Sequence, residues 1–389
     1  MKSFVFLASI EGDLLILAGI SSLLKTIFPQ NKNVLLLPKF PRVYPRINDY
    51  KSFFDEIIDV DAVFFGLHPT MVFNNISKIR KLYKRLAPYR KSVYFLFDIY
   101  NLVELAVYSF IKKNKDAQMI TVTAFEEHID INNLECLLRR TIIKSIYSIL
   151  LTRQMFFEFR IRNTENEGIN YLRAYTQIQL CINNSGCRNK YKKSFEKLPY
   201  PASFIMNNRS GHLAKYEFIE PYSVILFVDS QVSHWIDDYW HKIDKFLEIL
   251  EMKGISIYVK DHPNCTRSGA NLLKSEKIRI IPKEITAELI FISNAHNIVG
   301  VFGHGSTSLI TASWLGIPAF DIGEYMEFDR NLLKKWVQFL KLGRGITRIK
   351  CLEDVKEVDF ATGVHRDFSV MENEKIWRDI FVEEFSETV

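Results

Sequence analysis

Two polar breaks between apolar strands decide the fold of this chain: Lys260-Asp261-His262-Pro263-Asn264, directly after the apolar run 255–259, and Gly303-His304-Gly305-Ser306-Thr307-Ser308, directly after 297–302. Short apolar runs of this kind are typical of buried parallel strands. Each break therefore places polar groups at the carboxyl end of a strand. Open α/β sheets bind their ligands at that end.

The second break also opens a predicted helix over 306–315, which Gly316 ends. The first turn of a helix offers backbone N–H groups and the positive end of the helix dipole. Together with the hydroxyls of Ser306, Thr307 and Ser308, these groups predict an anion site, most simply for a phosphate. The alternative is structural, because serine and threonine are also good N-cap residues in proteins that bind nothing there.

Outward from these breaks, strand-like and helical segments alternate along the whole chain, which indicates βαβ units and parallel sheets. Among these segments, 62–65, 223–228 and 278–281 are predicted to be strands, 102–113 a helix, and the lysine-rich segment 183–197 a loop. Tyr200–Pro221, with a proline near each end, is the expected crossing between two such series. We therefore expect an α/β protein with two Rossmann-like, doubly wound domains facing a cleft, the arrangement called GT-B in glycosyltransferases. The expected parts are an acceptor-side domain at 1–200, a linker at 201–222, and a donor domain with a closing C-terminal helix at 223–389.

Composition fits a folded soluble protein of this size, and the cysteine pattern predicts a cytoplasmic one that could associate with the inner face of the inner membrane. The 389 residues suffice for two hydrophobic cores, and the net charge of +6 favours an anionic ligand or membrane surface but is too weak to indicate nucleic acid. Glu11 and Asp13 interrupt the first apolar run, so we expect a β-strand there rather than a signal peptide. The five cysteines are scattered without CxxC spacing, which predicts free thiols and no metal site.

The order of these motifs resembles the bacterial GT-B sialyltransferases, in particular the polysialyltransferase and lipooligosaccharide sialyltransferase families. His262-Pro263 matches their HP motif and Ser306-Thr307 matches their S-S/T motif. Glu126-Glu127 matches the acidic pair of a D/E-D/E-G motif, although His128 stands where the family has glycine. The segments 224–231 and 282–288 are similar to the opening of the family's C-terminal domain and to the lead into its ribose-binding acid.

The resemblance implies an inverting glycosyltransferase that moves a nonulosonic acid such as sialic acid from a CMP-activated donor. The acceptor would be a glycan or lipid-linked glycan in bacterial surface polysaccharide assembly. Neither a metal ion nor a cofactor is expected, because protein groups would neutralise the phosphate. CMP-Kdo transfer, a UDP-sugar 2-epimerase-like GT-B isomerase and a non-catalytic glycan-binding protein remain as alternatives.

The resemblance also assigns roles to residues. Glu126 would be the general base, with Glu127 as second choice, and His262 would hydrogen-bond the departing phosphate. Glu288 would accept the ribose hydroxyls. The substrate-binding residues implied are Lys260, Pro263, Glu288, Gly303, Gly305, Ser306, Thr307, Ser308 and Asp229.

Each assignment has a structural alternative. His262 before proline could serve only in a turn, the acidic pair could be a solvated helix start, and Glu288 could be a surface acid. The basic, apolar segment 131–162, predicted to be helical, admits two interpretations. It could bind an anionic membrane surface or a lipid-linked glycan, or it could pack on the sheet with its arginines in water.

Overall fold

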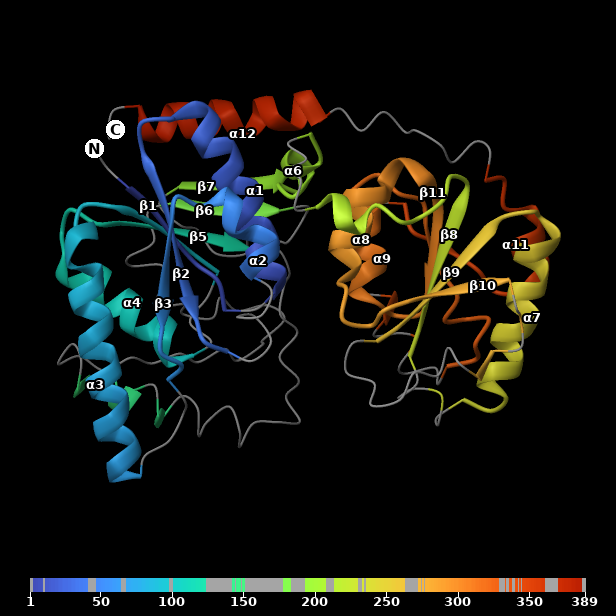
Figure 1. Ribbon diagram of the computed structural model, residues 1–389, viewed down its shortest axis with the longest axis horizontal. Helices are drawn as coiled ribbons and strands as arrows, with labels where there is room; N and C mark the ends of the chain where they lie inside the picture. The colour runs from blue at the N-terminus through green and yellow to red at the C-terminus, as the bar shows by residue number, and fades with distance from the viewer. Residues whose placement is uncertain are drawn as a thin grey trace. The chain divides into compact units, whose positions relative to one another are not determined.

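Two parallel β-sheets form the framework of the protein, one in each half of the chain (Figure 1). In this computed structural model the chain divides into two compact units, Met1–Phe204 with Met371–Val389, and Ile205–Val370. The boundary after Phe204 lies inside the expected linker, 201–222. The structure describes residues 3–9, 11–40, 47–63, 68–97, 101–123, 142–143, 145–147, 149–150, 178–182, 193–207, 213–229, 233, 236–262, 272–273, 275, 277–328, 333, 336–337, 340–341, 343, 345–360 and 370–386.

The first unit contains a seven-stranded sheet in the order β3-β2-β1-β4-β5-β6-β7, with every neighbouring pair parallel. The order runs outward one way from β1 and then outward the other way from β4, so the topology switches between these two strands. The strands are β1 (Ser3–Leu7), β2 (Lys32–Pro38), β3 (Glu56–Val60), β4 (Val93–Leu96), β5 (Gln118–Thr123), β6 (Ile178–Ile182) and β7 (Lys193–Leu198).

Helices cover both faces of this sheet. Val5 and Leu7 point to the face packed by α3 and α4, whereas Phe4 and Phe6 point to the other face, because side chains alternate along a strand. Figure 1 shows α1 and α12 on the side of the sheet opposite α3 and α4. The helices are α1 (Glu11–Ile27), α2 (Ile47–Tyr50), α3 (Pro69–Leu86), α4 (Leu102–Lys113), α6 (Ser203–Asn207) and α12 (Val370–Phe385).

The C-terminal helix α12 belongs to the first unit, which corrects its expected place in the C-terminal domain. The ring of Phe385 lies 5.5 Å from that of Phe4, centroid to centroid, and Nε1 of Trp377 donates to the carbonyl of Pro199 at 2.9 Å. Phe381 adds an edge contact to Phe95. The sequence pattern shows that one face of the helix is apolar, but it does not show which of two apolar sheets that face will cover.

The second unit repeats the architecture with six parallel strands in the order β10-β9-β8-β11-β12-β13. Its topology switches between β8 and β11, the positions equivalent to β1 and β4. The strands are β8 (Ser223–Val228), β9 (Ser256–Asp261), β10 (Ile278–Ile281), β11 (Ile298–Gly303), β12 (Ala319–Asp321) and β13 (Thr347–Arg348).

Two pairs of helices enclose the second sheet. Val224, Leu226 and Val228 pack with α7, whereas Phe227, on the opposite face, contacts Phe291 of α8 at 5.9 Å between ring centroids. Figure 1 shows α7 and α11 on one side and α8 and α9 on the other. The helices are α7 (Tyr239–Met252), α8 (Ala287–Asn294), α9 (Thr307–Trp314) and α11 (Leu352–Glu357).

This architecture confirms the expected α/β class with two Rossmann-like, doubly wound domains. Two expected details were wrong. The third strand is 56–60 rather than 62–65, and part of the lysine-rich segment 183–197, expected as a loop, belongs to β7. Most of 131–162 lies outside the described residues. No helix in the described part of the chain is both long and apolar enough to cross a membrane.

Candidate functional site at the carboxyl edge of the second sheet

Three strand ends meet at the topological switch point of the second unit. Asp229 follows β8, His262 follows β9 and His304 follows β11. The registers Val228 with Asp261 and Leu226 with Phe302 place these three ends level with one another. Because β8 separates β9 from β11, the backbones of the outer two lie two strand spacings apart, about 10 Å.

A tight turn follows β11. Gly305 has φ +54°, and a Cβ atom built there would lie 2.3 Å from the ring of Trp336, so a larger residue would be strained and would also clash. The N–H groups of Gly305 and Gly323 donate to Oδ1 of Asp321 at 3.4 and 3.3 Å. Burial raises the pKa of Asp321, and these two hydrogen bonds act in the opposite direction. Asp321 thus holds the turn from beneath.

The turn leads into the N-terminus of α9. Ser306 is the N-cap, and its Oγ accepts the N–H of Ser308 at 3.2 Å. Thr307 is exposed and Ser308 is half-buried, while Gly303 ends the buried strand. The capping role is therefore real, but it leaves the hydroxyl proton of Ser306 as a donor for an anion placed before the helix.

A buried histidine links two of the strand ends. The hydroxyl of Tyr239 accepts the N–H of Asp229 at 3.1 Å and lies 2.8 Å from Nε2 of His304, which fits a hydroxyl that donates to a neutral imidazole. Burial lowers the pKa of His304 to about 4, although the nearby carboxylate of Asp229 acts to raise it. The ring of Phe328 covers the imidazole at 5.0 Å between centroids. The pattern of apolar strand and glycine turn did not reveal this link.

His262 is exposed just beyond β9. Its backbone N–H donates to Oδ1 of Asp261 at 2.9 Å and to the carbonyl of Val228 at 3.1 Å. These bonds fix where the main chain leaves the strand, so they fix the point from which the imidazole projects. Pro263 lies outside the described residues.

Lys260 is buried, and its Nζ donates to the carbonyls of Asp261 and Lys283, each at 3.2 Å. Its charge also acts on the half-buried Glu288, whose carboxylate is hydrogen-bonded by the side chain of Thr311 on α9. Burial raises the pKa of Glu288 in spite of both interactions. The structure therefore joins Lys260 and Glu288, and it adds Thr311, for which the sequence contained no signal.

The acidic pair Glu126-Glu127 follows β5 but lies outside the described residues. At the switch point of the first unit the structure instead shows a capped helix start. The N–H of Ser9 donates to Oδ2 of Asp13 at 3.0 Å, and Asn101 caps α4 in a capping box with Glu104. Nδ2 of Asn101 also donates to Oγ of Ser9 at 3.2 Å. Sequence reasoning missed this cluster, which joins the helices following β1 and β4.

Comparison with solved structures defines the fold as GT-B. A protein from Listeria monocytogenes assigned as a UDP-N-acetylglucosamine 2-epimerase matches with a TM-score of 0.59 and 10% identity, over 100% of this chain and 98% of that one. A second UDP-N-acetylglucosamine 2-epimerase matches with a TM-score of 0.56, 10% identity and the same coverage. The UDP-GlcNAc 2-epimerase of Methanocaldococcus jannaschii matches with 0.54 and 13%, over 91% and 98%. Protein-family models and curated protein sequences give no match.

These matches contradict the resemblance to sialyltransferases. Three structures that share the fold over 91% or more of this chain are UDP-sugar 2-epimerases. The predicted partners, a CMP-nonulosonate donor and a glycan or lipid-linked acceptor, were therefore wrong. The prediction of a sialyltransferase-like enzyme was wrong for the same reason. The HP and S-S/T pairs are short, and serine and threonine are common wherever a helix begins with a cap, as Ser306 shows here. Their order alone therefore did not define a family.

Proposed function

We propose that this protein is an isomerase of nucleotide sugars, of the UDP-sugar 2-epimerase type. The observation that carries the proposal is the turn from Gly303 to Ser308, a glycine turn and helix N-terminus at the switch point of the second sheet. Its support is the likeness, over the full length of both chains, to UDP-N-acetylglucosamine 2-epimerases. The likeness lies in fold alone, so the substrate is part of the proposal.

The proposed role of the turn is to bind one phosphate of a nucleoside diphosphate. Ser306 would donate its hydroxyl proton, and Thr307 stands exposed at the first helical position. Backbone N–H groups and the helix dipole favour negative charge there. His262 would approach from the far side of β8, across about 10 Å, which leaves room for more than one phosphate.

The proposed reaction requires more than binding. To invert C2 of the sugar, one group removes the C2 proton, and the electron pair left on C2 forms a C1–C2 double bond as the nucleoside diphosphate leaves C1. A second group then delivers a proton to the opposite face of C2 while the diphosphate re-forms its bond to C1, so two proton-transfer groups are needed. His262 is the proposed group on the second unit, since it is an exposed titratable side chain at the switch point. Glu288 is proposed to accept sugar or ribose hydroxyls, and Asp229 to border the same space.

The test is to incubate the protein with UDP-N-acetylglucosamine in D2O and to follow the sugar by proton NMR. We expect a second UDP-sugar, inverted at C2, to appear, with deuterium at C2 of both sugars. Rapid formation of UDP without any inverted UDP-sugar would refute the isomerase. Deuterium-free inversion would refute the proton-transfer step.

Two variants of the second unit test whether its residues take part in the reaction. His262→Gln should lower the rate of inversion at least about a hundredfold if this imidazole carries a proton. His241→Gln is the matched control, because His241 is an exposed histidine of the same unit on α7. Ser306→Ala should weaken UDP binding about tenfold, the effect of losing one hydrogen bond to a charged group. Equal activity in His262→Gln and His241→Gln would remove His262 from the mechanism.

A further inference from the structure

A separate cavity of about 630 Å³ opens at the β10 edge of the second sheet. A volume of this size is in the range of small-molecule sites. Its lining comes from β9, β10, the segment after β10, and the short 3-10 helix Ala214–Tyr216 with the residues that follow it. The principal side chains are those of Lys215, Tyr216, Phe218, Tyr258, Arg279 and Ile280.

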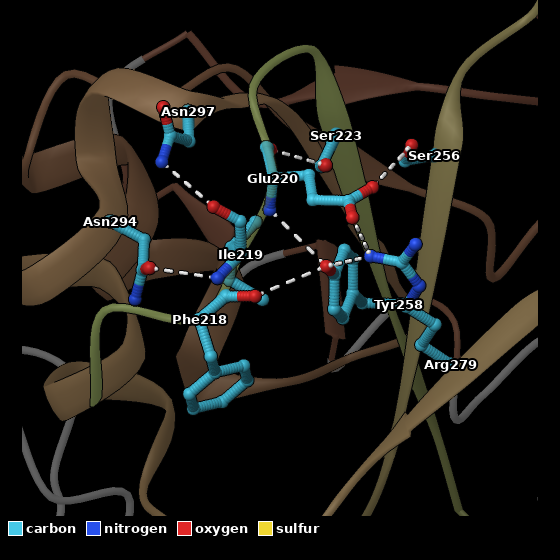
Figure 2. A network of polar contacts seen from close by, with 9 residues as sticks. All are labelled: Phe218, Ile219, Glu220, Ser223, Ser256, Tyr258, Arg279, Asn294 and Asn297. Carbon is cyan, nitrogen blue, oxygen red and sulfur yellow. Dashed lines mark hydrogen bonds and ion pairs between the residues drawn. The ribbon is translucent and has the colours of Figure 1, made fainter. Parts of the chain in front are cut away.

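Arg279 lies at one end of a polar network whose hub is the hydroxyl of Tyr258 (Figure 2). Its Nη1 lies 2.5 Å from Oε1 of Glu220 and 2.8 Å from the hydroxyl of Tyr258, and the guanidinium carbon lies 5.6 Å from the centre of the Tyr258 ring. The side chain of Arg279 is 51% exposed, so these contacts orient the guanidinium without enclosing it. A guanidinium has five N–H donors, and both polar contacts use Nη1. A planar cation is thus held in place at the cavity wall.

Residues 218–220, which include the lining residue Phe218, are also fixed by hydrogen bonds. The hydroxyl of Tyr258 donates to the carbonyl of Phe218 and accepts the N–H of Glu220, both at 3.2 Å. Ile219 is tied on its other side, because its N–H donates to Oδ1 of Asn294 at 3.0 Å and its carbonyl accepts from Nδ2 of Asn297 at 2.7 Å (Figure 2). Residues 218–220 are therefore anchored to β9 and to the end of α8. The cavity needs little ordering when a ligand enters, which favours binding.

The lining combines rings with positive charge. Nζ of Lys215 lies 4.8 Å from the centre of the Tyr216 ring, which repeats the pairing of Arg279 with Tyr258. Apolar side chains complete the cavity, and Phe218 and Ile280 are 37% and 45% exposed. Lys215 and Arg279 are the charged residues of the lining, and Glu220, which pairs with Arg279, is not a lining residue, so the lining itself favours an anion.

We propose that this cavity binds a small molecule that joins a flat ring to a single phosphate or carboxylate group. The ring would lie against the aromatic side chains, and the anionic group would accept hydrogen bonds from Arg279. None of the cavity's lining residues belongs to the strand-end site, although Pro282 and Ile285 follow the carboxyl end of β10. Tyr258 lies three residues before the end of β9, about 10 Å from the carboxyl edge. The proposal does not depend on the isomerase activity.

The experiment titrates the protein with phenyl phosphate, and separately with phenol and with inorganic phosphate, by calorimetry and by ligand-observed NMR. Phenyl phosphate should bind with a dissociation constant of about 1 mM or below. Phenol, which lacks the anion, and inorganic phosphate, which lacks the ring, should each bind at least about tenfold more weakly. Equal binding of inorganic phosphate and phenyl phosphate would overturn the proposal, as would no binding of phenyl phosphate up to about 10 mM.

Substitutions at four exposed residues test whether phenyl phosphate binds in this cavity. Arg279→Gln and Ile280→Glu should each weaken phenyl phosphate about tenfold, the first by removing the cation and the second by adding a repelling charge. Arg348→Gln and Met252→Glu are the matched controls, an exposed ion-paired arginine and an exposed apolar residue away from the cavity, and both should bind as wild type.

Ser306→Ala separates this cavity from the strand-end site, and it should leave phenyl phosphate binding unchanged. Loss of binding in Ser306→Ala with retention in Arg279→Gln would assign the probe to the N-terminus of α9 and overturn the proposal. Binding of phenyl phosphate does not depend on UDP-sugar isomerase activity. Either the cavity proposal or the isomerase proposal can therefore be refuted while the other stands.

Discussion

The buried imidazole of His304 should make the second unit sensitive to acid. In the unfolded chain this histidine has a pKa near 6.5, and in the folded protein burial lowers its pKa to about 4. Above pH 6.5 the imidazole is neutral in both states and contributes nothing to the pH dependence. Between pH 6.5 and 4 only the unfolded chain binds the proton, so the free energy of unfolding falls as the pH falls.

The two pKa values set the size of the effect. Integrated from pH 7 to pH 5, they predict a loss of about 2 kcal/mol in the free energy of unfolding. Glu288 and Asp321 act in the opposite direction, since their folded pKa values are raised and protonation favours the folded state. Glu288 and Asp321 are present in both wild type and His304→Gln, so their contribution to the pH dependence is the same in both proteins. Comparison of wild type with His304→Gln therefore isolates the histidine.

The assay is urea unfolding at pH 7 and pH 5, followed by tryptophan fluorescence. Four of the five tryptophans fall within Ile205–Val370, so this signal reports mainly the second unit. The loss between the two pH values should be about 2 kcal/mol larger in wild type than in His304→Gln. The exposed His241→Gln should behave as wild type. Equal losses in wild type and His304→Gln would show that the folded protein accommodates the imidazolium, and the account of a desolvated His304 would be wrong.

Substitutions at three further positions, two of them with a control variant, test the packing and capping. Gly305→Ala should cost roughly 2–4 kcal/mol by urea unfolding, because the added Cβ meets the ring of Trp336 at a left-handed backbone position, whereas Gly12→Ala, with no atom within 4 Å, should not destabilise. Trp377→Phe should lower the unfolding free energy of the first unit by about 2 kcal/mol, since it leaves a buried carbonyl without its donor; an unchanged midpoint would mean the bond is dispensable. Asn101→Ala should cost about 1 kcal/mol in thermal unfolding and Asn101→Asp much less, because aspartate can still cap α4.

The repeated alternation of apolar strand and amphipathic helix was enough to predict both sheets. Leu102–Lys113, Ser223–Val228 and Ile278–Ile281 begin and end where the pattern placed them. The third strand was misplaced because β3 is an edge strand, Glu56-Ile57-Ile58-Asp59-Val60, with acids among its apolar residues. An edge strand needs only one partner and exposes more of its length, so its apolar pattern is weak. The apolar residues at 62–65, which follow β3, were therefore predicted as the strand instead.

The strand ends and the helix cap at the candidate site were predictable in position, but the contacts between their side chains were not. Strand ends and a capped helix can be recognised locally, so Asp229, His262 and Ser306 were identified from short segments. The pairing of His304 with Tyr239 joins residues 65 positions apart, and the contact of Glu288 with Thr311 joins two helices. Such contacts depend on how helices pack across a sheet, which a single sequence does not encode in a short pattern. The same limit explains why two short motifs indicated the wrong family.

The return of α12 to the first sheet has a consequence for synthesis. Residues 205–370 form one uninterrupted stretch, whereas the first unit is divided between the two ends of the chain. A ribosome therefore delivers every part of the second unit before it releases the aromatic side chains of Trp377, Phe381 and Phe385 that cover the first. Although domains usually mature in the order in which they emerge, the later-made half of this protein can finish folding while the earlier half still exposes an uncovered apolar face. A chain truncated shortly before residue 370 should then aggregate through its N-terminal half.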